Sequence, residues 1–431
     1  MWRRITKVLS NKTVMVRLAI TLGLLLIFRI VSHIPIPLLD TSLIRNAIAT
    51  SGSFLDILNN FSGQALAQSS ILALGISPYI TASIVVQLLQ MVLPSLKELS
   101  EQGDSGKQKL NRITRYLAIA LAFIQGLGLL LGLAYGTPGN ILIPSIIEAN
   151  ALHFIYMALT ITAGTAFSIY IGDLITKKGI GNGTSILIVA GIVTSFPVMI
   201  TSLNQKYLGA NLTGWNVVLY IFVLVLFLAI LLGVVYLQIA TRKVPIQYAN
   251  RQGKSDSHIP IKLNSSGVIP VIFASTIMSI PLTFVGLSQS SGSNVSIWMN
   301  QIFNNQMPIG FILYVILIVL FSFFYAFLTI DPNKMADNLQ KSNAYIPSVK
   351  PGEDTKNFIA RLLFKITVLG TVYLVVLAVL PIIISQIFGF TGSAITIGGT
   401  SLLIVVGVAV ETTQQVETDA EKEEYQGIFK K

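Results

Sequence analysis

The feature that most constrains this chain is a series of long apolar runs, which recur from one end of the sequence to the other. A helix needs about 20 mostly apolar residues to cross a hydrocarbon layer roughly 30 Å thick. A spanning segment is helical because its backbone N–H and C=O groups find no water to bond there. The sequence predicts ten membrane-spanning helices, at residues 16–35, 71–93, 115–135, 152–172, 184–203, 216–238, 267–287, 308–330, 363–388 and 396–411.

Composition agrees with a single membrane domain. Hydrophobic residues make up 53% of the 431 residues and charged residues only 11%, which is too little charge to cover the surface of a soluble protein. The first run follows a basic start, as a signal peptide does, but it leads into Ser-His-Ile-Pro-Ile-Pro from Ser32 rather than into a small-residue cleavage site. We therefore interpret this run as a retained first helix of an all-α integral membrane protein.

The distribution of basic residues predicts the orientation. Lys and Arg favour short loops on the cytoplasmic side of a membrane. With the N-terminus inside, all 29 basic residues except Arg29, Arg45 and Lys206 fall in cytoplasmic segments or at the cytoplasmic ends of spans. Adding or removing one internal span would destroy that partition. Both termini are therefore predicted to be cytoplasmic.

The chain lacks the residue patterns of an enzyme or a metal protein. It has no cysteine, its three histidines are far apart, and it contains neither a phosphate-binding loop nor a His-Glu-x-x-His pair. The glycine-rich stretch Gly179–Gly183 opens a predicted span and is interpreted as a tight cytoplasmic turn. We expect no catalytic residues, no metal and no cofactor.

Ionisable groups avoid the middle of the spans, which weakens an ion-coupled mechanism without ending it. No Asp or Glu lies at the centre of a predicted span, and Arg29 is near enough to the outer end of the first span to extend its guanidinium toward that face. A secondary transporter with an ion site lined by backbone groups stays open as an alternative. So does an insertase or scaffold without an aqueous pore.

Three segments outside the spans have unusual features. Residues 53–61 are apolar but too short to cross a membrane, so they predict either a half-helix lining a cavity or an interfacial helix lying flat. Two long loops, 239–265 and 331–362, carry many basic residues. Long loops often carry function, so these are either a docking platform or plain charge balance beside anionic lipid.

Several ordered stretches resemble one family. Ile71–Gln90 resembles the second helix of SecY/Sec61-alpha proteins, Gly267–Ser275 their seventh helix and Gly398–Val406 their tenth. Lys178–Gly183 resembles the entry to the fifth helix, and Ala336–Ser342 with Pro351-Gly352 resembles the last large cytoplasmic loop. The matches run in order from residue 28 to about 406, so the resemblance covers nearly the whole chain.

The resemblance implies a protein-conducting channel of two inverted five-helix halves around a central pore. Unfolded secretory polypeptides would cross through the pore, and membrane helices would leave sideways through a lateral gate between the second and seventh helices. The halves would be residues 1–203 and 204–431, with a cytoplasmic tail at 412–431. A narrow ring of apolar side chains would block ions and seal around a threaded peptide. The matching positions are Ile76, Ile80, Ile188, Ile192, Ile272 and Ile404.

The same resemblance assigns the remaining sites. Residues 53–70 would form a plug, with its core at Phe54, Leu55, Asp56, Ile57, Leu58, Asn59 and Asn60. Polar residues at the lateral gate would be Thr81, Gln87 and Asn264, able to hydrogen-bond across a closed gate. Cytoplasmic docking residues would be Arg242, Lys243, Arg251 and Lys350. Lys350 departs from the family's usual arginine and lacks its bidentate fork.

The partners that the resemblance implies are SecE-like and SecG-like membrane subunits, the SecA motor ATPase, the ribosome, and unfolded preproteins with their signal sequences. The bilayer would be the plasma membrane of a bacterium. Any ATP would be used by a partner.

Overall fold

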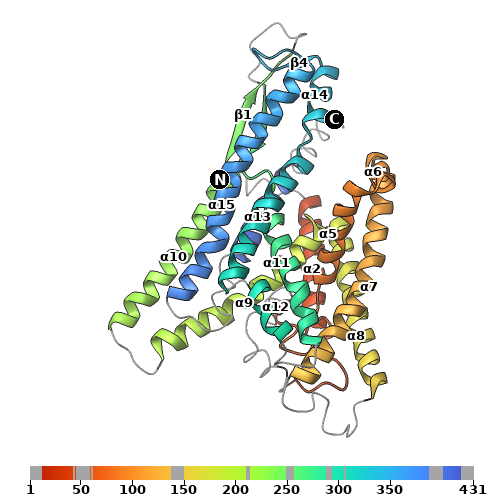
Figure 1. Ribbon diagram of the computed structural model, residues 1–431, viewed down its shortest axis with the longest axis vertical. Helices are drawn as coiled ribbons and strands as arrows, with labels where there is room; N and C mark the ends of the chain where they lie inside the picture. Colours follow the sequence, from red (N-terminus) through yellow and green to blue (C-terminus); the bar gives the residue numbers. More distant parts are fainter. Residues whose placement is uncertain are drawn as a thin grey trace.

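The computed structural model describes residues 12–41, 44, 59, 62–136, 150–209, 214–248, 257–287, 294–304, 307–387 and 401–418. Helices dominate these residues, and the molecule is elongated along them (Figure 1). The long helices are α2 (Lys12–Val31), α5 (Ser77–Val92), α7 (Asp104–Gly136), α8 (Ala151–Lys178), α9 (Gly183–Leu208), α10 (Gly214–Ile239), α11 (Ile269–Leu287), α13 (Pro308–Thr329), α15 (Glu353–Ile387) and an unlabelled helix at 401–418. Shorter helices are α6 (Pro94–Glu101), α12 (Asn294–Phe303) and α14 (Pro332–Lys341).

Each of the ten predicted spans overlaps one of the long helices. Seven of these helices are long and apolar enough to cross a membrane, and α5 with α6 makes an eighth if the bent pair is one span. The helices α11 and 401–418 are not among these eight. They bring the number of spans to the predicted ten if they also cross the membrane. Residues 396–400 of the tenth predicted span lie outside the described residues.

The second predicted span starts later than expected and ends in a sharp bend. Residues 71–76 form turns rather than helix, and Gly75 there has a φ of +53°. Helix α5 then starts at Ser77, with Pro78 in its first turn where a missing N–H costs no hydrogen bond. Pro94 forces Leu93 into an extended conformation, so α6 leaves α5 at an angle of 102°. Proline and glycine thus place the two breaks.

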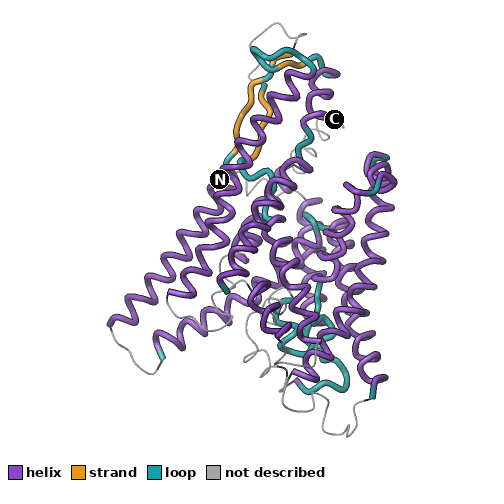
Figure 2. The backbone as a smooth tube through the Cα atoms, viewed as in Figure 1, coloured by secondary structure: helices purple, strands orange, loops and turns teal. Residues whose placement is uncertain are grey.

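The two long loops contain short strands, an exception to the expected all-α structure. Strand β1 (Thr241–Pro245) pairs antiparallel with β3 (His258–Lys262). Strand β2 (Gln247–Tyr248) pairs antiparallel with β4 (Ala344–Tyr345) from the other loop. Apolar side chains from both loops pack beneath these strands, among them Val244, Ile261 and Ile346. The two loops therefore form one body at the strand end of the molecule, the end that carries β1–β4 (Figure 2).

The largest apolar core lies where most of the long helices meet. Its buried side chains come from α2, α8, α9, α10, α11, α13, α15 and the helix at 401–418, and from the segment just before α5. Many side chains on α2 and α10 stay exposed and apolar, as expected of helices that face lipid. On the other side, α7 packs against both α5 and α8. The core is thus central, and the exposed apolar surface is peripheral.

Candidate functional site

The structure brings the six predicted ring isoleucines to the central core. Ile76 precedes α5 and Ile80 lies within it, Ile188 and Ile192 lie one turn apart on α9, Ile272 lies on α11 and Ile404 on the helix at 401–418. Five of them are buried members of one apolar cluster, and Ile80 packs against it. Ile192 is only 1% exposed. Among the described residues, the six isoleucines therefore belong to one buried apolar centre.

A folded segment covers this centre. Within residues 62–75, which we call the covering segment, Ala65 and Leu72 are fully buried members of the same cluster as the isoleucines. The segment is also bonded to the chain that follows α2: Ile36 N donates to Ser69 O at 2.7 Å and Ile71 N donates to Ile34 O at 3.0 Å. Turns and backbone hydrogen bonds, rather than a helix, give it shape.

Only one residue of the predicted plug core lies among the described residues. Asn59 is buried, its amide Nδ2 donates to Gln64 Oε1 at 3.1 Å, and its Oδ1 accepts from Ala67 N at 2.9 Å. The Asn59 side chain therefore hydrogen-bonds to two residues of the covering segment. The others, Phe54, Leu55, Asp56, Ile57, Leu58 and Asn60, lie outside the described residues.

The three predicted gate residues bond to different elements. Thr81 Oγ1 donates to Ser77 O within its own helix at 3.2 Å. Asn264 Nδ2 donates to Gln238 Oε1 on α10 at 3.2 Å. Gln87 Oε1 accepts from Tyr325 Oη at 2.5 Å, which joins α5 to α13. Of the three, Gln87 makes the bond that leaves α5 for a facing helix, and that helix is α13, the eighth predicted span, rather than the seventh helix of the predicted gate.

Sequence reasoning missed Tyr325 and the aromatic cluster around it. Phe273 of α11 packs edge-on against Tyr325 and Phe321 of α13, with ring centroids 5.4 and 5.7 Å apart. Ile84 of α5 is buried in the same cluster. The seam that faces α5 is therefore built from α11 and α13 together. Nothing in an apolar run distinguishes these aromatic residues, because their role depends on a contact 238 positions away along the chain.

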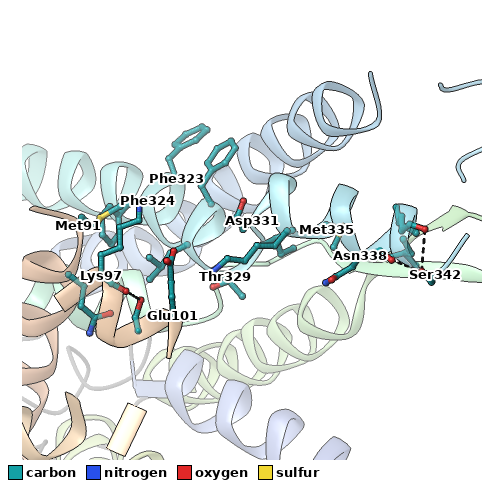
Figure 3. A pocket seen from close by; sticks show the side chains of 18 residues that line it. Met91, Lys97, Glu101, Phe323, Phe324, Thr329, Asp331, Met335, Asn338 and Ser342 are labelled. Carbon is teal, nitrogen blue, oxygen red and sulfur yellow. Dashed lines mark hydrogen bonds between the residues drawn. The ribbon is translucent and has the colours of Figure 1, made fainter. Parts of the chain in front are cut away.

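A large cavity opens at the strand end of this seam. It measures about 1050 Å³ and lies between α5–α6 on one side and α13–α14 on the other. Figure 3 shows Met91, Lys97 and Glu101 on one wall, facing Met335 and Asn338 on the other. Phe324 and Phe327 add apolar surface, and Asp331 and Lys334 add charge. Such a space has room for an apolar segment with a polar flank.

Basic side chains are exposed at the strand end. Arg242 and Lys243 extend from β1 into solvent, and Lys350 is exposed in the turn before α15. Arg251 lies outside the described residues. Because β2 and β4 join the two loops, these exposed residues belong to one surface rather than two. In the part of the chain that the structure describes, no group of three His, Asp or Glu side chains is placed to hold a metal ion.

A buried apolar centre, a segment packed over it and an interhelical seam beside it are the features expected of a helical membrane channel. The family model of SecY matches residues 70–413, and this chain belongs to the SecY family. It is 42% identical to a Bacillus subtilis protein named protein translocase subunit SecY, covering 100% of both chains.

Two solved structures share the fold. One describes how the plug domain of SecY stabilises the closed translocation channel and maintains a membrane seal. It has a TM-score of 0.64 at 20% identity, covering 94% of this chain and 92% of the other. The second is canine Sec61 in a ribosome-channel complex, with a TM-score of 0.60 at 18% identity, covering 94% and 93%.

Proposed function

We propose that this chain is the pore-forming subunit of a protein translocase and has no catalytic activity of its own. An unfolded polypeptide would pass between the six ring isoleucines, and an apolar segment would leave through the seam of α5 against α11 and α13. The observation that carries the proposal is the buried apolar centre under the covering segment, in a chain of the SecY family. Branched aliphatic side chains exclude hydrated ions yet deform around a peptide.

Translocation into membrane vesicles tests this function. The chain, with SecE-like and SecG-like subunits, is placed in vesicles and supplied with a SecA-type motor, ATP and an unfolded preprotein. Appearance of protease-protected preprotein supports the proposal. Saturable uptake of a small solute by the chain alone, without protein translocation, would instead favour the secondary transporter.

The residue range 53–70 would then act as the plug, and the halves 1–203 and 204–431 would move apart about the ring. The membrane would be a bacterial plasma membrane with both termini cytoplasmic, so the strand end would face the cytoplasm. This placement follows from the basic residues concentrated in the predicted cytoplasmic loops.

The Gln87–Tyr325 hydrogen bond would hold the gate closed. Tyr325→Phe keeps the aromatic packing on Phe273 and removes only the hydroxyl that donates to Gln87. An interhelical hydrogen bond of this kind contributes about 0.6 kcal/mol on average. We therefore expect a preprotein with a shortened apolar signal to be translocated roughly threefold better.

Tyr314→Phe on the same helix is the matched control, because the Tyr314 hydroxyl is buried without a hydrogen-bond partner among the described residues. Equal effects from the two variants would mean that the Gln87 bond does not hold the gate.

The joined loops would dock a large cytoplasmic partner, a ribosome or a SecA-type motor. Changing both Arg242 and Lys243 to Glu reverses two exposed charges on β1. Each exposed charge pair contributes little by itself, but reversing two charges together is expected to weaken the binding of purified ribosomes to the protein in nanodiscs about tenfold. The remaining affinity is expected to depend less on salt concentration. Lys107→Glu, exposed on α7, is the control. Unchanged ribosome affinity in the double variant would remove β1 from the docking surface.

A further inference from the structure

Arg29 is a charged side chain within the first membrane helix, and the sequence left it without a role. A charge inside a span is costly and usually marks a functional contact. Its guanidinium does not simply extend to the outer face: Nη1 donates to the backbone carbonyl of Gly63 at 2.9 Å and to Ser32 Oγ at 3.4 Å. The charge of Arg29 is therefore directed onto the covering segment.

A second helix holds the same point of the covering segment. Thr194 Oγ1 of α9 lies 3.2 Å from the same Gly63 carbonyl and 2.6 Å from Gly191 O of its own helix, so its one hydroxyl hydrogen is shared between these two acceptors. The neighbouring Gln64 Nε2 donates to Ser195 Oγ, also of α9, at 3.3 Å. One carbonyl thus accepts from α2 and from α9 at once, and the next side chain adds a bond to α9.

Gly63 permits this double contact because it has no Cβ. Its φ is +69°, a conformation that side-chain-bearing residues rarely adopt. A Cβ at this position would lie 2.8 Å from Gly191 Cα, closer than atoms can pack. The backbone of the covering segment therefore lies directly against α9, and Ile192 of the predicted ring follows Gly191 in the sequence.

We propose that Arg29 is a positioning residue that holds the plug closed, by locking Gly63 between α2 and α9. The inference rests on the proposed function, since it assigns the device that keeps the plug of that channel in place. When α9 and α2 separate, Gly63 O loses one of its two donors and the covering segment is released from the ring. We call these hydrogen bonds from Arg29 and Thr194 to Gly63 O the latch. The latch links release of the plug to movement of the helices that line the centre.

The conservative variant separates this role from the mere presence of charge. A hydrogen bond to a charged group shifts an equilibrium by about tenfold or more. Arg29→Gln removes the charge, whereas Arg29→Lys keeps it without the planar fork of donors. We expect the released state to be about ten times more populated in the glutamine variant, and to an intermediate degree in the lysine variant.

Thiol labelling measures the release, because the chain has no cysteine and a single introduced one is unique. Ser62→Cys, at a side chain only 1% exposed, places the thiol beside Gly63. In membranes containing the full complex, a water-soluble maleimide is expected to label this thiol about ten times faster when Arg29→Gln is also present. Ion leakage through the resting channel is expected to rise in the same variant.

Two matched controls and a second variant sharpen the test. Lys12→Gln removes an exposed charge from the same helix and is expected to change neither readout. Thr194→Val removes the other donor to Gly63 without changing the charge, and it is expected to raise the labelling rate. Thr201→Val on the same helix is its control, because Thr201 bonds only within α9, and this variant is expected to leave the labelling rate unchanged. Should Arg29→Gln fail to insert, Thr194→Val carries the test.

Deletion of residues 53–60 separates the two ways of failing. In one outcome the deletion leaks ions, while Arg29→Gln and Thr194→Val are labelled slowly and do not leak. That outcome would overturn the latch but not the proposed channel. A deletion that inserts but stays impermeable would overturn the plug itself, and the latch with it. Leakage in the deletion with fast labelling in both point variants supports the proposal.

Discussion

Replacing Ile188 and Ile192 together by asparagine is expected to make the resting protein conduct ions. Both side chains lie on one face of α9, and both are almost completely buried in the central cluster. A narrow apolar constriction blocks ions because water leaves it, and amide groups there would retain water. We expect the ion current across planar bilayers to rise at least about tenfold over that of the unaltered protein.

The control for this variant places the same side chains at exposed positions of the same helix. Val193 and Ile200 are exposed apolar residues of α9, and changing both to asparagine is expected to leave the bilayer as tight as before. If the variant at 188 and 192 folds and inserts but carries no current, the isoleucines are not the barrier and a different part of the protein seals the membrane.

Gly164→Val is expected to destabilise the protein by about 3 kcal/mol or more. Gly164 lies on α8, where a Cβ would be 2.2 Å from the carbonyl oxygen of Ile71, in the covering segment that leads into α5. Any side chain must push this backbone away from α8. The free energy of unfolding, followed by thermal melting in detergent, is expected to fall sharply, and the covering segment is expected to shift with it.

Gly233→Ala tests whether this cost comes from contact or from the loss of glycine. Gly233 lies within α10, where an added Cβ meets nothing within 4 Å. Alanine favours a helix by about 1 kcal/mol over glycine, so this variant is expected to melt at the same temperature or higher. A Gly164→Val protein as stable as the unaltered one would contradict the close approach of α8 to Ile71.

The helices were predictable because each depends on a local run of apolar residues. The runs give α10 and α13 to within about two residues, and the glycine-rich turn before α9 is confirmed, with Gly181 at a φ of +75°. Helices α7 and α15 extend well beyond their predicted spans because their polar ends leave the apolar run and continue as helix. A hydropathy window sees only the part that lipid requires to be apolar.

The contacts that fix the site depend on residues distant in sequence, so single-chain patterns could not give them. The pairing of β2 with β4 joins loops almost a hundred residues apart, and neither two-residue strand has a pattern of its own. Arg29 and Gly63 are 34 positions apart, and the acceptor is a backbone carbonyl, which every residue carries. The six isoleucines were assigned by family resemblance, since isoleucine is ordinary in any membrane helix.

Cross-linking of an arrested polypeptide tests the central claim most directly. A photoreactive amino acid replaces Ile192 in the complete complex, and a preprotein is halted halfway through translocation. Leu228, on α10 and 61% exposed, carries the same probe as the control. The channel predicts strong cross-links from position 192 to the arrested chain and none from position 228. Efficient translocation with no cross-link from position 192, or with equal cross-links from both positions, would contradict passage through the isoleucine ring.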